Sequence, residues 1–203
     1  MAKYANLTLG EIEAVVNKLG GMDGVEKFLQ EDVVLSYLDG RRVWEVWMSI
    51  EIGHFTKPEE ISLALASGRF DFESAESLLN ESFPIFPRRR EVCLVLVSFK
   101  DLGLDSSAKW HDVLERAQKL GLCVCPPEVG PQLRLQYIEQ EAGEVLFIGM
   151  HGLVDSHDDS YHIFNVWADA EKKHLDTVDP LNEIGMYDDG VFVFVLHPNG
   201  KIE

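Results

Sequence analysis

The chain has 203 residues, of which 46% are hydrophobic and 26% are charged, a composition typical of a globular protein that can bury a sizeable core. Thirty-five acidic residues against eighteen basic ones give a formal net charge of −17, which opposes direct binding to nucleic acid and to anionic membrane surfaces. The sequence lacks a secretory signal, a membrane-spanning apolar run and a disulfide framework, so we expect a cytoplasmic protein with reduced thiols.

The first fifty residues predict two helices and a hairpin. Thr8 and Glu11 form a capping box at the start of a helix that ends at a glycine pair. A shorter helix is predicted over 23–31. The apolar runs 33–38 and 43–52 are separated by an Asp-Gly dipeptide, which favours a tight hairpin turn, although the second run does not alternate cleanly.

The next forty residues predict a helix over 58–67 and a shorter one over 75–79. The segment 83–90 contains two prolines and three arginines, and it interrupts regular structure. We therefore expect a helical hairpin with a mixed α/β part over residues 1–86 and an α+β domain over 91–203. A single core shared by both parts is the alternative.

The second half of the chain predicts mainly strands. Alternating or continuously apolar runs are separated by polar turns, and one amphipathic helix lies among them. The expected strands are 92–99, 122–125, 133–138, 144–150, 161–167, 173–178 and 191–197, and the expected helix is 110–120. The predicted fold class is α+β, with a mainly antiparallel sheet of five to seven strands and one packed helix.

The acidic residues are concentrated towards the C-terminal end. Residues 139–203 hold fourteen acidic and three basic residues, a formal charge of −11, yet they also contain apolar runs that must be buried. This combination predicts a folded sheet whose polar edges and loops carry the acidic residues. Such a surface is suited to cations or to basic partners.

Two segments carry a resemblance to a known family. Residues 7–29, LTLGEIEAVVNKLGGMDGVEKFL, resemble the opening of a family of uncharacterised bacterial proteins. Residues 120–137, LGLCVCPPEVGPQLRLQY, are similar to the C-terminal signature of the same family. The resemblance implies a bacterial, cytoplasmic protein, and it assigns no activity, cofactor or partner to any residue.

The densest group of potential metal ligands lies within twelve residues of the acidic part. Carboxylates and imidazoles could hold a divalent ion there if they converge. The alternative is a solvated acidic connection between two strands, where neighbouring side chains alternate faces. The candidate ligands are His151, Asp155, His157, Asp158, Asp159 and His162.

Four further residues are candidates for binding. Trp44 and Trp47 cannot both be buried easily on one face of a strand, so we expect one of them to face a partner. Glu128 and Arg134 lie beside a turn rich in proline and glycine. They could contribute to a site, or they could pair with each other.

The sequence favours a non-catalytic protein-binding or regulatory module with an acidic surface, one version of which is an acidic inhibitor of a basic partner. No cofactor is expected for such a module. The alternative is a metal-dependent enzyme that uses the His/Asp cluster at 151–162 and a divalent metal ion. No phosphate-binding loop, HExxH or GxSxG motif is present, which favours the first interpretation. The oligomeric state stays open.

Overall fold

The computed structural model describes residues 8–18, 21–22, 37–38, 41–42, 44–155, 159–181 and 189–196. The chain divides into two compact units, residues 1–43 and 44–203. In the first unit, helix α1 (Leu9–Lys18) follows Thr8 as predicted, and strands β1 (Tyr37–Leu38) and β2 (Arg41–Arg42) pair antiparallel. The helix expected over 23–31 lies outside the described residues.

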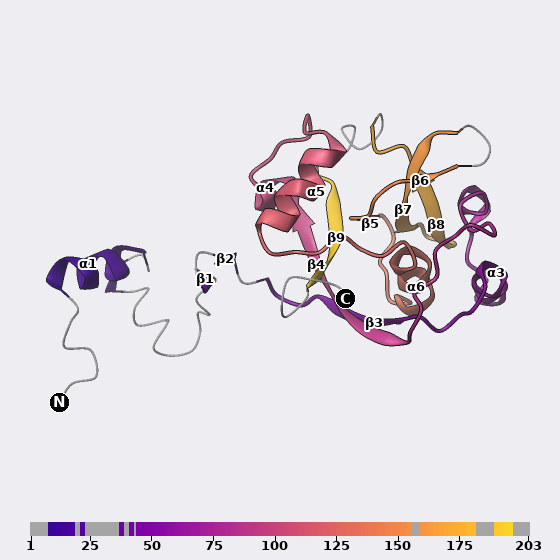
Figure 1. The fold of residues 1–203 in the computed structure, drawn as a ribbon, viewed down its shortest axis with the longest axis horizontal. Coiled ribbons are helices and arrows are strands. Elements are labelled where there is room, and N and C mark those ends of the chain that lie inside the picture. Colours follow the sequence, from indigo (N-terminus) through magenta and orange to yellow (C-terminus); the bar gives the residue numbers. More distant parts are fainter. Residues whose placement is uncertain are drawn as a thin grey trace. The chain divides into compact units, whose positions relative to one another are not determined.

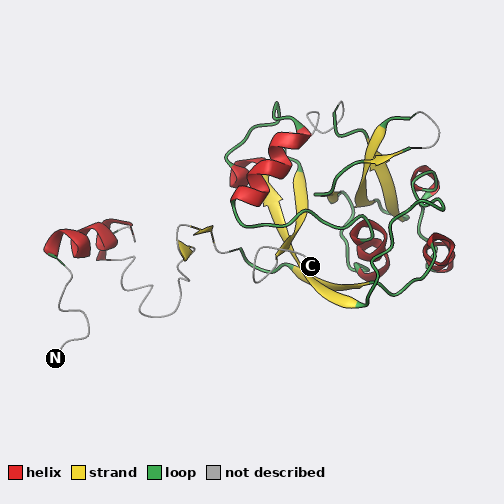
Figure 2. Ribbon diagram, in the orientation of Figure 1, coloured by secondary structure: helices red, strands yellow, loops and turns green. Residues whose placement is uncertain are grey.

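The second unit is built on a seven-stranded mixed sheet (Figures 1 and 2). The strand order is β3-β4-β9-β5-β7-β6, and β8 also pairs with β7 outside this path. Every pair is antiparallel except β5 with β9, so the α+β class with an antiparallel-rich sheet is confirmed. The strands are β3 (Met48–Ile52), β4 (Arg90–Ser98), β5 (Val145–Ile148), β6 (Leu153–Val154), β7 (Tyr161–Ala168), β8 (Lys173–Val178) and β9 (Val191–Leu196).

The proline-rich segment 83–90 does not separate two sheets. Strands β3 and β4, which lie on either side of it in sequence, pair in a continuous register from Met48↔Leu94 to Ile52↔Arg90. Buried residues from both sides of the segment belong to one hydrophobic core. Strand β3, within the run expected over 43–52, is therefore an edge strand of the main sheet, and the partner of β1 is β2.

Helices cover the sheet from two directions (Figure 1). Helix α6 (Val129–Gln136) contacts β3, β7 and β8, so the sheet curves around it, and α3 (Pro58–Ser67) packs on α6. The short helix α4 (Phe99–Leu102) contacts β4 and α5 (Trp110–Lys119). A 3₁₀ turn, η1 (Glu73–Ala75), lies against β8. None of the described helices is both long and apolar enough to cross a membrane.

The strand predicted over 133–138 is wrong, because residues 129–136 form helix α6. Residues 129–134 are all buried, so the helix shows no polar face that would reveal its period. Pro131 lies in the first turn of the helix, where its missing N–H costs nothing, so the proline and glycine expected to form a turn there are compatible with a helix. The alternation of Leu133, Leu135 and Tyr137 thus does not report a strand.

Candidate functional site

Glu128 is a buried carboxylate at the start of α6, and it joins three segments of the fold. Its Oε1 accepts the N–H of Gly53 at 2.9 Å and Nε2 of Gln132 at 3.1 Å, and its Oε2 accepts the N–H of Phe86 at 2.7 Å. Its side chain is fully buried, so these donors replace water. Glu128 therefore stabilises the fold from inside and presents no group to a ligand.

The same face of α6 satisfies the open edge of β3. Gln136 accepts the N–H of Glu51 at 2.9 Å and donates to the Glu51 carbonyl at 2.8 Å. It also donates to Gln132 at 3.1 Å, which continues a ladder of side chains from Glu128 along the helix. Because an uncovered edge strand invites pairing with other chains, this ladder protects the sheet.

Arg134 is fully buried at the opposite side of α6 and shares no described ion pair with Glu128. Its guanidinium donates to Gln140 Oε1 and to the Tyr137 carbonyl, and it lies 5.1 Å from the ring centre of Phe70. Burial lowers the pKa of Arg134 to about 10. The side chain fixes the segment after α6, and the predicted pairing of Glu128 with Arg134 does not occur.

Trp44 and Trp47 differ in exposure, and both precede the first residue of β3. The N–H of Trp47 donates to the Leu94 carbonyl at 2.8 Å, which ties this segment to β4. Residues three apart in an extended segment point to opposite sides, so the burial of one leaves the other nearer the surface. Trp44 is only 8% exposed and donates its indole N–H to the Leu120 carbonyl at 3.1 Å, so it is a core residue. Trp47 is half-buried, which leaves it as the candidate partner-facing aromatic.

Trp47 lies in a groove of about 390 Å³ between the start of β3 and the residues after α6. Its ring meets the ring of Tyr137 edge-on, with the centroids 4.9 Å apart. Ile138 is 52% exposed beside them. The groove residues are Trp47, Met48, Gln136, Tyr137, Ile138 and Glu139. Its described lining is thus mainly apolar, with one carboxylate and no basic side chain.

The described members of the predicted metal cluster do not converge. Asp155 is buried and accepts the hydroxyl of Ser77 at 2.6 Å, whereas His151 is exposed. His162 Nε2 lies 2.6 Å from the Ser160 hydroxyl. Among the described residues, no three of His151, Asp155, Asp159 and His162 bring ligand atoms together. His157 and Asp158 lie outside the described residues.

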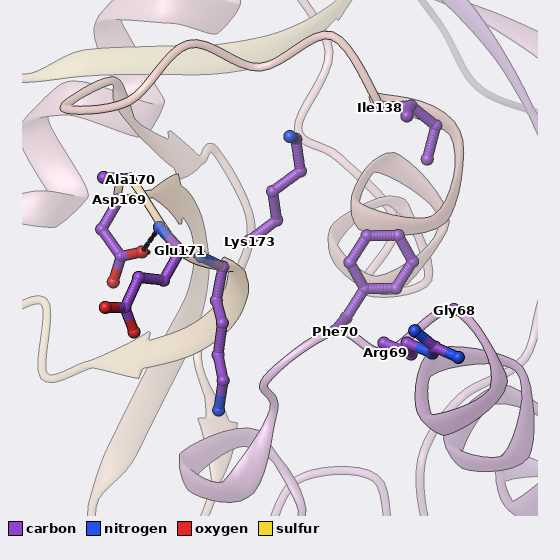
Figure 3. Close-up of a pocket in the computed structure, with 9 residues that line it drawn as sticks. Gly68, Arg69, Phe70, Ile138, Asp169, Ala170, Glu171 and Lys173 are labelled. Carbon is purple, nitrogen blue, oxygen red and sulfur yellow. Dashed lines mark hydrogen bonds between the residues drawn. The ribbon is translucent and has the colours of Figure 1, made fainter.

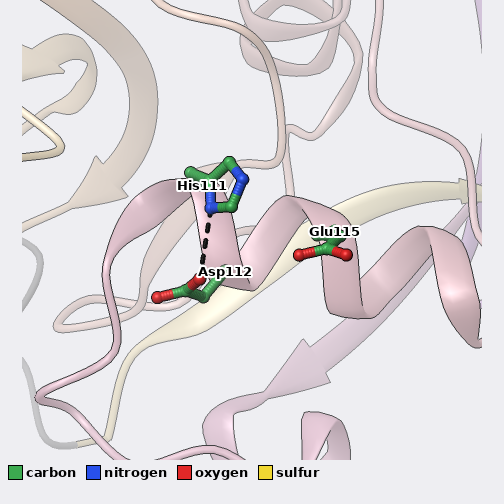
Figure 4. Close-up of side chains that lie close together, drawn as sticks. All are labelled: His111, Asp112 and Glu115. Carbon is green, nitrogen blue, oxygen red and sulfur yellow. Dashed lines mark hydrogen bonds and ion pairs between the residues drawn. The ribbon is translucent and has the colours of Figure 1, made fainter.

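A different group of potential ligands is exposed on α5 (Figure 4). The ligand atoms of His111, Asp112 and Glu115 lie within 4.8 Å of one another. Glu115 already pairs with Lys119 at 2.5 Å, and the His111 side chain is 80% exposed. Exposed helical neighbours of this kind meet by spacing alone, so the group by itself indicates no function.

A polar cluster that the sequence did not single out lies beside a second hollow, of about 310 Å³ (Figure 3). Gly68, Arg69 and Phe70 line one side of this hollow, and the β7–β8 turn, residues 169–173, lines the other. His174 lies next to that turn, between Asp169 and Asp71. Asp71 and His174 are about a hundred positions apart in the chain, so no local pattern could have joined them.

Comparisons of the chain with protein-family models, with curated proteins and with solved structures find no match.

Proposed function

We propose that the chain is a protein-binding module whose groove at Trp47 receives an apolar side chain from a basic segment of another protein. The observation that carries the proposal is the combination of a half-buried aromatic pair, Trp47 and Tyr137, with the exposed Ile138. Aromatic side chains held in a partly desolvated hollow are typical anchors of protein interfaces.

The polar groups in the groove that are open to a partner are hydrogen-bond acceptors. Burial raises the pKa of Tyr137 to about 12, and its hydroxyl donates to Glu144 at 2.9 Å, so the phenol stays neutral and its proton is already used. Glu139 lies in the groove, and Glu45 is exposed nearby in sequence to Trp47. An incoming segment therefore meets apolar surface and acceptors, which suits an apolar residue flanked by lysine or arginine.

Long-range charge favours the same partner. The net charge of −17 attracts a basic segment during encounter and repels an acidic one. Salt screens such attraction over about 8 to 10 Å at physiological ionic strength, so association should slow as salt is added. An acidic inhibitor of a basic protein is one form that this module could take.

Selection from a displayed library of random peptides tests the proposal directly. We expect the selected peptides to carry an aromatic or aliphatic residue between basic ones, and to bind more weakly at higher salt. Ile138→Asp places a charge on an exposed side chain without disturbing the core, and it should weaken binding by about tenfold or more. Trp47→Ala should do the same, with thermal melting as the check on its folding.

Leu63→Asp is the matched control. Leu63 is 68% exposed on α3 and is not one of the groove residues, so its replacement should leave binding unchanged. Selected peptides that bind equally to the Ile138→Asp and Leu63→Asp variants would show that the groove is not the binding site. Selection of acidic peptides would refute the charge argument.

The metal-dependent enzyme has less support, because the described ligands at 151–162 do not share a site. Its test is thermal melting of chelator-treated protein with calcium, magnesium, manganese or zinc. A binding module of the proposed kind should keep its melting temperature in each ion. A rise that disappears in His151→Ala would instead favour a metal site in this segment.

A further inference from the structure

A second hollow adjoins the groove at Trp47, and the two share Ile138. This hollow, of about 310 Å³, lies between residues 68–70 and the β7–β8 turn (Figure 3), and Ile138 lines both it and the groove. Because Ile138 is 52% exposed, a segment that covers this side chain can reach both hollows at once. The surface open to a partner is therefore longer than the groove alone.

Phe70 forms an apolar wall of the second hollow, and two contacts hold its ring in place. A Cβ at Gly68 would lie 2.4 Å from Cε2 of Phe70, so the ring packs directly on the backbone of a residue without a side chain. The guanidinium carbon of Arg134 lies 5.1 Å from the ring centre. The wall is thus formed before any ligand binds, which lowers the entropic cost of binding.

Positive charge gathers around this hollow. Among the charged residues that line it, basic side chains outnumber acidic ones. These residues are Arg69, Asp169, Glu171, Lys172 and Lys173. Arg134, which contacts Phe70 without lining the hollow, adds a buried charge, because its pKa of about 10 keeps it protonated at neutral pH. The hollow is therefore locally positive on a chain whose net charge is −17.

Lys173 is the cation that this hollow leaves open to a ligand. Asp169 accepts two backbone amides of its own turn, and Lys172 Nζ lies 3.5 Å from Oδ2 of Asp71. Among the residues that the structure describes, neither Lys173 nor Arg69 forms an ion pair. Arg69 is exposed, whereas Lys173 is half-buried and extends from the turn along the hollow (Figure 3).

The acidic side chains of the turn leave room for an anion beside Phe70. In Figure 3 the carboxylates of Asp169 and Glu171 lie well apart from the Phe70 ring, with Lys173 between them and the ring. The methylene groups of an incoming aspartate or glutamate can lie on Phe70 while its carboxylate meets the ammonium of Lys173. The hollow therefore combines an apolar wall with a cation.

The net charge decides how such a carboxylate reaches the hollow. A charge of −17 repels a free small anion at long range. A carboxylate carried on a segment that is already anchored in the groove is delivered at high effective concentration, and the basic residues of that segment offset the repulsion. The charges therefore favour an acidic residue of the bound segment over a free anion.

We propose that the second hollow binds the side-chain carboxylate of an aspartate or glutamate in the same partner segment whose apolar residue enters the groove at Trp47. This inference rests on the proposed function, because it takes the groove as the place where the segment is anchored. One side chain, Ile138, joins the two hollows, and an extended segment advances about 3.3 Å per residue, so the acidic residue lies about two to four positions from the apolar anchor.

Selection from the displayed peptide library on the full chain, and in parallel on Lys173→Glu, tests the inference. On the wild type, the selected peptides should keep a net positive charge and carry aspartate or glutamate at one spacing from the apolar anchor. On Lys173→Glu the same position should carry lysine or arginine. Lys109→Glu makes the same change of charge at an exposed residue outside both hollows, so it should select the same peptides as the wild type.

A pair of synthetic peptides measures the size of the effect. The pair takes one selected sequence with either glutamate or glutamine at the acidic position. The wild type should bind the glutamate peptide about threefold to tenfold more tightly at low salt, and Lys173→Gln should bind the two peptides equally. Thermal melting checks that each variant is folded.

The outcomes separate this inference from the proposed function. If Trp47→Ala weakens binding but the selected peptides show no acidic position, the groove stands and the inference fails. The inference also fails if Lys173→Gln keeps the full preference for glutamate. If the selected peptides bind Trp47→Ala as tightly as the wild type, the groove itself is not the binding site.

Discussion

Removing the buried carboxylate of Glu128 should be among the most destabilising single changes in the chain. In Glu128→Ala the amides of Gly53 and Phe86 lose their acceptor inside the protein, where water cannot replace it. A buried donor without a partner costs about 1–3 kcal/mol, so the two amides together should cost about 2–6 kcal/mol. That is a large part of the stability of a typical domain, about 5–15 kcal/mol.

Glu128→Gln separates the contribution of the hydrogen bonds to stability from the contribution of side-chain packing. Glutamine keeps the volume and one oxygen, but its NH₂ group must face one of the two amide donors, so we expect a loss of about 1–3 kcal/mol. Glu139→Gln is the matched control, since Glu139 is exposed and its replacement should change stability by less than about 0.5 kcal/mol.

Urea unfolding followed by tryptophan fluorescence measures these differences. All four tryptophans lie in residues 44–203, so the signal reports the unit that contains Glu128. The midpoint should fall in the order Glu139→Gln, Glu128→Gln, Glu128→Ala, while the slope stays constant. A loss below about 0.5 kcal/mol in Glu128→Ala would refute the assignment of the two amides to this carboxylate.

Three further predictions follow from burial and backbone geometry. Trp44→Ala should cost about 3–5 kcal/mol in the same urea assay, because the side chain is 8% exposed; a cost below about 1 kcal/mol would place it outside the core. Gly53→Ala should cost about 3 kcal/mol, since φ is +75° and a Cβ would collide with the Arg88 carbonyl; an unchanged midpoint would contradict this geometry. Burial raises the pKa of the Cys125 thiol, so iodoacetamide should modify the half-buried Cys93 first in folded protein, as mass spectrometry can verify; equal labelling would indicate that Cys125 is accessible.

The sequence predicted the elements whose periodicity is visible. The hairpin of β7 and β8 has two strand-forming runs around a polar turn at 169–172, and α5 places Trp110 and its other apolar residues on one stripe. Both predictions are confirmed, because a polar turn marks the hairpin and α5 has one buried and one solvated face. Helix α6 was missed for the opposite reason, since consecutive residues 129–134 are buried and no solvated face marks its period.

The candidate site depends on contacts that no local pattern contains. Trp44 and Trp47 were identified together as candidates, because they cannot both be buried easily on one face of a strand, and the structure places Trp44 in the core and leaves Trp47 half-buried. Its neighbours Tyr137 and Ile138 come from residues about ninety positions away, so the groove could not be predicted. The roles of Glu128 and Arg134 were likewise hidden, because their partners are set by the fold.

The position of β9 has a consequence for how the protein is made. This strand is the last of the described chain, yet it lies between β4 and β5. While the ribosome is still synthesising residues 191–196, β4 and β5 each have an inner edge with no neighbour, and the core residues Phe192 and Phe194 are missing. Nascent chains therefore carry two incomplete half-sheets with open edges, which are prone to pair with other chains. The sheet can therefore close only after residues 191–196 have been synthesised, and its open edges need protection until then.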